Sequence, residues 1–199
     1  MWAPILLSAQ NFGQLVDHRD GKKYKTIKVD KFEIMAENLA FAEKGICYEM
    51  ESLFCEDFGR LYSFKEITSS TEKICPKGWH VPTSAEWKYI FTKIGKINTY
   101  KFGVNVNLLS NPLNFLPSGY GNGEEPGYVK FLSIQLRGFF ASSSKSVVNG
   151  EFGDYEQWYV VRSSEEDQES AGNSKKSFRY DLFGTSKDNF LSCRCIKDY

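Results

Sequence analysis

The sequence predicts a single α+β domain with one main helix, small antiparallel sheets and long loops. Three observations support this prediction. Alternating strand patterns lie on both sides of one capped helix, five cysteines are available to staple the chain, and long stretches are rich in Asn, Gly and Pro. The 199 residues suffice for one domain with a sizeable core or for two small ones.

The segment before the helix is expected to contain a strand pair and a loop. Residues 11–23 are polar, and residues 24–29 alternate as a strand does. Residues 32–39 are expected to continue a hairpin. The Cys47–Cys55 segment is expected to be a loop, and residues 59–64 fit either a short buried strand or the start of a helix.

The main helix is expected over about residues 84–95, directly after Pro82. Thr83 and Glu86 have the spacing of a capping box, in which each side chain bonds the backbone N–H of the other residue. Gly95 is the expected C-terminal cap. The expected apolar face consists of Trp87, Ile90, Phe91 and Ile94.

Loops and further strands are expected after the helix. Residues 96–127 have the composition of loops, and Phe139-Phe140 begins a strand before a serine run. Residues 157–162 read as a strand, and 163–177 read as a polar, acidic loop. Two last strands are predicted from the alternation of Phe178, Tyr180 and Leu182, and of Leu191, Cys193 and Cys195.

The charge balance and the apolar runs exclude two partner classes. The chain has 25 Lys plus Arg and 25 Asp plus Glu, with no basic run, so no nucleic-acid partner is expected. No apolar run is long enough for a transmembrane span. Residues 1–9 resemble the end of a secretory signal peptide, with cleavage after Ala9; the alternative is a short N-terminal strand.

The cysteines indicate disulfides in an oxidising compartment. No C-x-x-C pair is present and the chain has only two His, so no structural zinc site is expected. Cys47 and Cys55 could close one short loop. Cys75 could reach the C-terminal pair, Cys193 and Cys195, and one cysteine would then be left over.

Six ordered motifs resemble the Fibrobacter succinogenes major paralogous domain, a family of secreted and surface bacterial proteins without a well-established activity. The resemblance extends from about Val16 to the C-terminus, which suggests one domain over 16–199. The motifs are Asp20–Lys28, Met35–Leu39, Cys47 to Tyr62, Cys75–Trp87, Phe115–Tyr120 and Arg194–Asp198. The family's W-W-S-S stretch is weakened here to Phe139–Ser143.

The resemblance implies a disulfide pairing and a fold. The family usually has Val at the position of Cys193, which favours a Cys75–Cys195 disulfide and a thiol at Cys193 on an apolar face. Because Cys193 and Cys195 point to one side of a strand, a Cys75–Cys193 pairing is the alternative. The family resembles the C-type-lectin-like fold, in which the termini lie side by side and long loops present the ligand site. Formylglycine-generating enzymes share that fold.

The most conspicuous motif residues are expected to have structural roles, and no catalytic residue is assigned. His80 could act as a base or a ligand, but no second His accompanies it, so a structural hydrogen bond is favoured. Glu37 and Asn38 resemble a buried polar pair that orders a turn. The structural motif set is Glu37, Asn38, Trp79, His80, Pro82, Thr83, Glu86 and Trp87.

Aromatic and amide residues of the loop-rich regions suggest a metal-free surface for sugars or protein partners. The candidates are Tyr120, Asn122, Tyr128, Asp154, Tyr155 and Trp158. Core filling is favoured for Trp158 and is an equal alternative for the three tyrosines. Glu125-Pro126-Gly127 only partly matches a lectin calcium motif, and the acidic run 165–169 fits a solvated loop, so neither a metal site nor a cofactor is expected.

Together these patterns predict a secreted or cell-surface, non-catalytic binding or adhesion module with a carbohydrate or protein ligand. One alternative is an enzyme related to formylglycine-generating oxidoreductases, which would need a reactive cysteine. The other is a structural surface subunit.

Overall fold

The computed structural model describes most of the chain. The described backbone covers residues 12–71, 73–94, 96–100, 103–108, 113–123, 127–150, 153–170 and 173–198. Side chains are described for 12–71, 73–94, 113–123, 127–145, 180, 182 and 184–198. The expected signal-peptide remnant, residues 1–9, lies outside the described residues.

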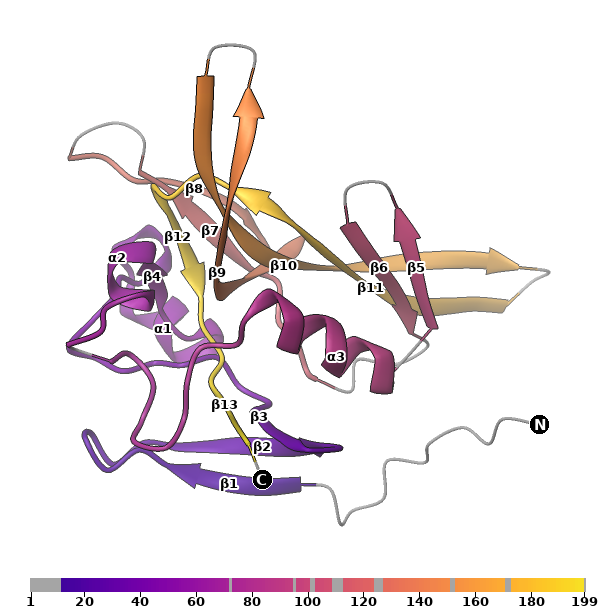
Figure 1. Ribbon diagram of the computed structural model, residues 1–199. Coiled ribbons are helices and arrows are strands. Elements are labelled where there is room, and N and C mark those ends of the chain that lie inside the picture. The colour runs from indigo at the N-terminus through magenta and orange to yellow at the C-terminus, as the bar shows by residue number, and fades with distance from the viewer. Residues whose placement is uncertain are drawn as a thin grey trace.

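A four-stranded sheet joins both ends of the described chain in the order β1-β2-β3-β13 (Figure 1). All three pairings are antiparallel. The strands are β1 (Phe12–Val16), β2 (Lys23–Val29), β3 (Phe32–Met35) and β13 (Ile196–Asp198). The expected hairpin therefore exists, but β3 ends at Met35, and β1 occupies part of the segment that looked merely polar.

A nine-stranded sheet forms the other layer, in the order β4-β12-β7-β9-β10-β11-β6-β5 with β8 on β7. Most pairings are antiparallel, but β9 runs parallel to both β7 and β12. The strands are β4 (Leu61–Ser63), β5 (Lys96–Tyr100), β6 (Gly103–Leu108), β7 (Ser118–Asn122), β8 (Lys130–Ile134), β9 (Arg137–Gly150), β10 (Gly153–Ser170), β11 (Asn173–Thr185) and β12 (Asn189–Ser192).

Few helices accompany the sheets. They are the 3-10 turn η2 (Tyr48–Met50), α1 (Ser52–Phe58), α2 (Phe64–Ile67) and α3 (Ser84–Ile94). The predicted mixture of helix and sheet is therefore confirmed. Among the described residues, no helix combines the length and the apolar content that a membrane crossing requires.

The loops are shorter than the sequence suggested. The Cys47–Cys55 segment contains η2 and part of α1, and residues 96–127 contain β5, β6 and β7. Within the expected acidic loop at 163–177, residues 163–170 and 173–177 are paired strands of β10 and β11, whose pairing extends from Trp158↔Thr185 to Ser170↔Asn173. Polarity was misleading here because strands of a hairpin can pair their backbones whatever their side chains are. Residues 59–64 satisfy both alternatives, since β4 leads directly into α2.

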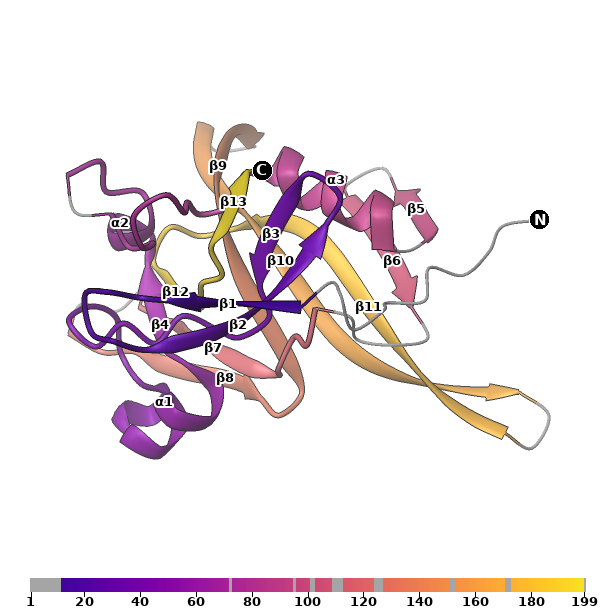
Figure 2. The same ribbon diagram turned by 90° about the horizontal axis from the view of Figure 1, so that it is seen from below.

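Helix α3 lies between the two sheets (Figures 1 and 2). Its buried side chains are Trp87, Ile90 and Phe91, as the predicted apolar face requires. They share a core cluster with residues of β2 and β3 below and with Phe140 and Tyr180 of the larger sheet above. The helix therefore positions one sheet on the other.

Both hydrogen bonds of the predicted capping box begin this helix. The backbone N–H of Glu86 donates to Thr83 Oγ1 at 3.1 Å, and the backbone N–H of Thr83 donates to Glu86 Oε2 at 2.7 Å. Burial alone would raise the pKa of Glu86, but the hydrogen bonds from Thr83 and His80 outweigh it and lower this pKa. A second capping box, Ser63 with Glu66, starts α2 and was not predicted.

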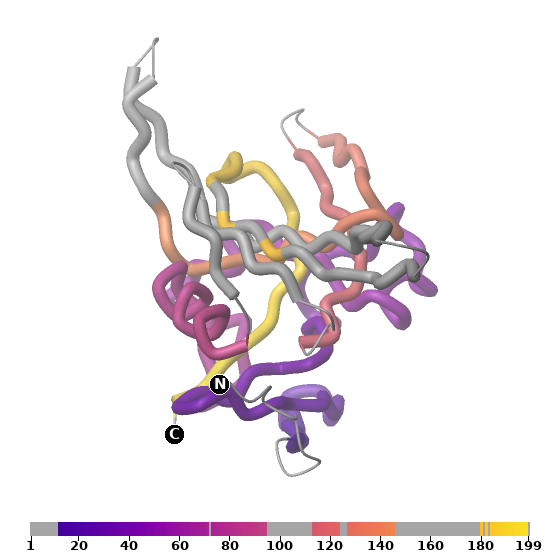
Figure 3. Tube along the Cα trace, turned by 90° about the vertical axis from the view of Figure 1, so that its right-hand side faces the viewer, coloured from indigo at the N-terminus to yellow at the C-terminus, as the bar shows by residue number. Residues whose placement is uncertain are grey.

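The C-terminal segment runs from the larger sheet to the smaller one (Figure 3, yellow). The expected last strand is interrupted at residues 193–195, which lie between β12 and β13. Two hydrogen bonds hold the interruption: Leu39 N–H donates to Cys193 O at 2.9 Å, and Met35 N–H donates to Cys195 O at 3.0 Å.

Arg194, in the middle of this interruption, is fully buried. Its guanidinium donates to Asn38 Oδ1 at 2.8 Å and to the backbone carbonyls of Met35, Leu113 and Asn114. Burial lowers its pKa to about 9, which still leaves the group charged at neutral pH. One side chain thus joins the C-terminal segment, the end of β3 and the segment that precedes β7.

We expect Arg194→Met to lower the free energy of unfolding by about 3–5 kcal/mol, because three buried acceptors and one partly buried acceptor lose their donor. Urea unfolding followed by tryptophan fluorescence measures this change. Arg137→Met, at an exposed position of β9, is the matched control and should change stability by less than about 0.5 kcal/mol. Equal stability of the Arg194→Met protein and the wild type would contradict the assigned role.

We expect the Glu86→Gln protein to lose less stability in acid than the wild type. A carboxyl group whose pKa is lower in the folded state stabilises the fold above its unfolded pKa, and this contribution disappears as pH falls through the folded value. Urea midpoints should therefore fall less steeply below about pH 4.5 for Glu86→Gln than for the wild type. Glu56→Gln, at an exposed site, is the control; identical profiles for Glu86→Gln and wild type would refute the expectation.

Candidate functional site

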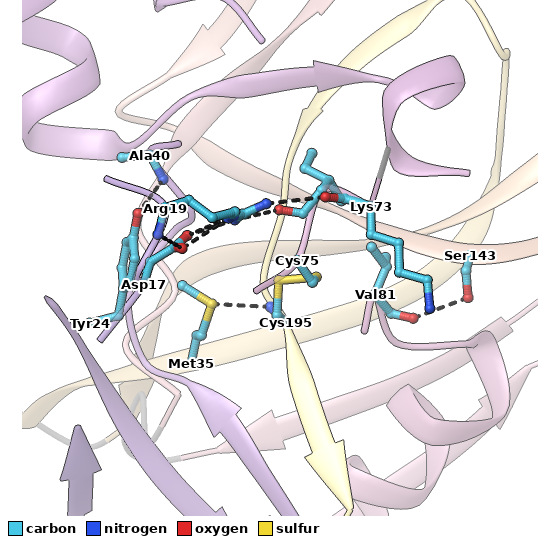
Figure 4. Close-up of a disulfide and its surroundings, with 11 residues drawn as sticks. Asp17, Arg19, Tyr24, Met35, Ala40, Lys73, Cys75, Val81, Ser143 and Cys195 are labelled. Atoms are coloured by element: carbon cyan, nitrogen blue, oxygen red, sulfur yellow. Dashed lines mark hydrogen bonds and ion pairs between the residues drawn. A yellow bond between two sulfur atoms is a disulfide. The ribbon is translucent and has the colours of Figure 1, made fainter. Parts of the chain in front are cut away.

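The loop Cys75–His80 is fastened to the C-terminal segment by a covalent bond and a backbone bridge. Cys75 and Cys195 form a disulfide with a Cα–Cα distance of 5.8 Å (Figure 4). His80 and Ile196 exchange two backbone hydrogen bonds of 2.8 and 2.9 Å. A turn at Gly78, whose φ of +83° favours glycine, completes the loop.

Arg19 holds the chain just before the loop from another side (Figure 4). Its guanidinium donates to the backbone carbonyls of Lys73 and Ile74 at 3.1 and 2.9 Å. It also pairs with the buried Asp17 carboxylate at 2.6 Å. Burial would raise the pKa of Asp17, but the hydrogen bonds from Arg19 outweigh it and lower this pKa. Arg19 therefore anchors the loop to the turn between β1 and β2.

Two serines of β9 hold the chain that follows the loop. Ser143 donates from its backbone N–H to Pro82 O at 2.9 Å and from its hydroxyl to Val81 O at 3.1 Å. Ser144 Oγ accepts from the backbone N–H of Ser84, at the start of α3, at 3.0 Å. Ser143 and Ser144 thus fix the chain between the loop and α3.

Three concave regions surround this rigid loop, and Trp79 lines all of them. We call them together the Trp79 surface. The first region has a volume of about 570 Å³, and its lining residues include Arg19, Lys73, Lys77 and His80. The second, of about 350 Å³, reaches Ser143 and Lys145 of β9. The third, of about 460 Å³, extends to β1 and Lys197.

The Trp79 surface is basic although the whole chain has no net charge. Among the residues whose side chains are described, none with a carboxylate lines the first or the second region. The third contains one, Asp17, which is paired with Arg19. The cationic lining residues of the three regions are Arg19, Lys73, Lys77, Lys145 and Lys197. The surface is thus suited to anions and to hydroxyl-rich ligands, since Ser70, Thr71 and Ser143 also line it.

Trp79 and His80 contribute to this surface mainly through structural contacts that shape it. Trp79 is 8% exposed, so it forms a wall and offers no open face for stacking. The Lys197 ammonium lies 5.2 Å from the centre of its ring. The His80 side chain is 40% exposed, and its Nε2 lies 3.1 Å from Glu86 Oε1. His80 therefore makes the structural hydrogen bond that the sequence favoured and still reaches solvent.

Asn38, Glu37 and Trp87 of the motif set also make structural hydrogen bonds. Asn38 is buried and links Arg194 to the backbone carbonyl of Phe58, to which its Nδ2 donates at 2.8 Å. Glu37 is half-buried and accepts from the backbone N–H of Lys25 at 2.7 Å. The two side chains order the chain by separate contacts. Trp87 is fully buried and donates from Nε1 to Ala141 O.

The ligand candidates of the β7–β8 region differ in exposure. Tyr120 packs on the core, with its ring centre 4.7 Å from that of Phe139. Asn122, at the end of β7, is half-buried opposite Asn189 of β12. Tyr128 is 59% exposed and is the one of the three that offers most of its ring to solvent.

The other three candidates lie on β10, and their side chains are outside the described part. Asp154 and Tyr155 pair with Asn149 and Val148 near the far end of β9, and Trp158 pairs with Lys145. Tyr120 lies instead next to Gly119, which pairs with Gly138 at the other end of β9. Gly138 is separated from the β9 partners of these three residues by 7 positions (Lys145) to 11 positions (Asn149), or roughly 20–35 Å of extended strand. The backbone therefore does not bring the six residues into one site.

The described residues contain one group of three or more potential metal ligands that lie close together. The sulfur atoms of Cys75, Cys193 and Cys195 are within 4.8 Å of one another and are buried. Two of them form the disulfide, and Cys47–Cys55 is the second disulfide, so both favoured pairings are confirmed. Cys193 is free, and burial raises the pKa of its thiol to about 12.

The sequence did not single out the cations of the Trp79 surface. Lys73 and Lys77 flank Cys75, and Arg19 precedes the Asp20-Gly21 turn, but lone charges next to a motif carry no pattern. Hydrogen bonds from Arg19 to the carbonyls of Lys73 and Ile74 bring these two segments together in the folded chain.

Comparisons with known proteins place the chain in a family. The model of the Fibrobacter succinogenes major domain matches residues 10–197. A search of curated proteins and a search of solved structures gave no match. The family match covers nearly the whole chain and agrees with the motifs that the sequence presents. The chain therefore belongs to the Fibrobacter succinogenes major domain family.

Proposed function

We propose that the chain is a secreted or cell-surface, non-catalytic binding module of C-type-lectin-like fold that binds an acidic carbohydrate at the Trp79 surface. The observation that carries the proposal is that Lys73, Lys77 and Lys145 line the first two concave regions, where the described lining residues include no carboxylate. In a chain with zero net charge, such a gathering favours ligands with carboxylate or sulfate groups.

The frame of the surface supports binding without rearrangement. The loop Cys75–His80 is held by the disulfide, by the bridge to Ile196 and by Arg19. A binding surface that is already rigid loses little conformational entropy when a ligand binds. The fold part of the proposal is supported by β1 and β13, which bring both ends of the described chain into one sheet.

The cysteine chemistry supports a non-catalytic role. An enzyme related to formylglycine-generating oxidoreductases would need a reactive thiol, but Cys193 is the one free cysteine and is fully buried. A protonated, buried thiol is a poor nucleophile. An acidic protein is the alternative ligand class, because carboxylates of a peptide would meet the same cations.

We expect Lys73→Glu/Lys77→Glu to weaken binding of dextran sulfate or oligogalacturonate by about tenfold or more, since two attractive charges become repulsive. The binding should weaken further as salt is added, because salt screens exposed charges. Isothermal titration against these two polymers, with neutral dextran as reference, measures the effect.

The matched control is Lys130→Glu/Lys187→Glu, which makes the same charge change outside all three concave regions. It should leave the affinity nearly unchanged. Equal losses in both double variants, or equal binding of neutral and charged polymers, would contradict the proposal. Binding of polyglutamate but not of either charged polysaccharide would favour the acidic-protein alternative.

A further inference from the structure

Cys193 lies beside the disulfide that closes the domain. Its sulfur is within 4.8 Å of both Cys75 Sγ and Cys195 Sγ, and all three residues are buried. A thiol beside a disulfide is the starting arrangement for thiol–disulfide exchange. We propose that Cys193 is a built-in exchange partner of Cys75, so that the long-range cross-link has two forms, Cys75–Cys195 and Cys75–Cys193. This proposal is independent of the ligand.

Chain entropy does not distinguish the two cross-links. The Cys75–Cys195 disulfide spans a separation of 120 residues, and Cys75–Cys193 would span 193 minus 75, which is 118. Loop-closure entropy depends on the logarithm of loop length, so the two forms are equivalent in this respect. Local packing alone must therefore select the partner of Cys75.

The backbone keeps both thiols available to Cys75. Residues 193 and 195 project to the same side of an extended segment, while Arg194 projects to the other and is held by its own hydrogen bonds. The carbonyls of Cys193 and Cys195 accept from Leu39 and Met35. Exchange therefore changes which side chain meets Cys75 while the segment between β12 and β13 stays anchored.

The exchange balances without an external oxidant or reductant. The Cys193 thiolate attacks Cys75 Sγ, the Cys75–Cys195 bond breaks, and Cys195 leaves as a thiolate. The proton lost by Cys193 is taken up by Cys195. One disulfide and one thiol are present before and after the step.

The closed fold slows this step. In-line attack requires the three sulfurs to lie on one line, with Cys75 Sγ in the middle. The Cys193 and Cys195 sulfurs would then be roughly 5.5 Å apart, which is a bond of about 2 Å plus a contact of about 3.5 Å. All three sulfurs lie within 4.8 Å of one another, so they form a triangle, and a side chain must rotate before attack. Burial also raises the pKa of Cys193 to about 12, which keeps it protonated. A local opening removes both obstacles.

The exchange would alter the Trp79 surface. Cys75 lines its first two concave regions and begins the loop that shapes them (Figure 4). A new partner for Cys75 changes the anchor point of this loop on the C-terminal segment.

The first test is Cys195→Ser, expressed under oxidising conditions. We expect Cys75 to pair with Cys193, so that no thiol of the denatured protein reacts with N-ethylmaleimide. Trypsin cleaves at Arg194 and so separates the two candidate partners of Cys75. Digestion of the Cys75–Cys193 form yields the peptide Ile74–Lys77 disulfide-bonded to the peptide Asp188–Arg194. Digestion of the Cys75–Cys195 form yields the peptide Ile74–Lys77 disulfide-bonded to the peptide Cys195–Lys197. A folded Cys195→Ser protein with two reactive thiols would overturn the proposal.

The second test uses the wild type, so it tests the proposed exchange even if the Cys195→Ser protein does not fold. The protein is held in mildly destabilising urea at pH 8.5 without added thiol, then blocked and digested. We expect the cross-link between Ile74–Lys77 and Asp188–Arg194 to accumulate with time in the wild type. Cys193→Val, the control, should keep only Cys75–Cys195. No accumulation in the wild type would overturn the proposal.

Discussion

The buried guanidinium of Arg194 is the constraint on which the rest of the structure depends. A charge without exposed surface is stable only where every donor finds an acceptor. Its acceptors come from two distant segments: Asn38 and Met35 near β3, and the carbonyls of Leu113 and Asn114. The demand for these partners fixes the C-terminal segment against the end of β3 and against the segment that precedes β7. The strand pairing of the C-terminal segment is interrupted at this point, between β12 and β13.

The disulfide and the helix act around this centre. Because Arg194 projects to one side, Cys193 and Cys195 project to the other, where Cys75 meets them. The cross-link then holds the loop Cys75–His80, and the capping box of Thr83 and Glu86 directs the following chain into α3. The residues of the motif from Cys75 to Trp87 thus have connected structural roles. The Trp79 surface is formed by the outer side of the same loop.

Much of the fold could be predicted from local patterns. The apolar face of α3 and its cap depend on spacings of three and four residues, which a sequence displays directly. The extent of the sheets could not be predicted, because β10 and β11 pair through their backbones along polar stretches. The ligand candidates share their residue types and a position in or beside loop-rich segments, but the sheet register separates Tyr120 from Tyr155 along β9.

The sequence by itself determined the family, the main helix and the short Cys47–Cys55 disulfide, because motifs and short spacings are visible in the order of residues. Only the tertiary structure decided that Arg194 is buried and that Arg19 anchors the Cys75 loop. It alone brought Lys73 and Lys77 to a basic surface beside Trp79, and Cys193 to the disulfide. These features depend on contacts between residues that are far apart in the chain, and such contacts leave no local pattern in the sequence.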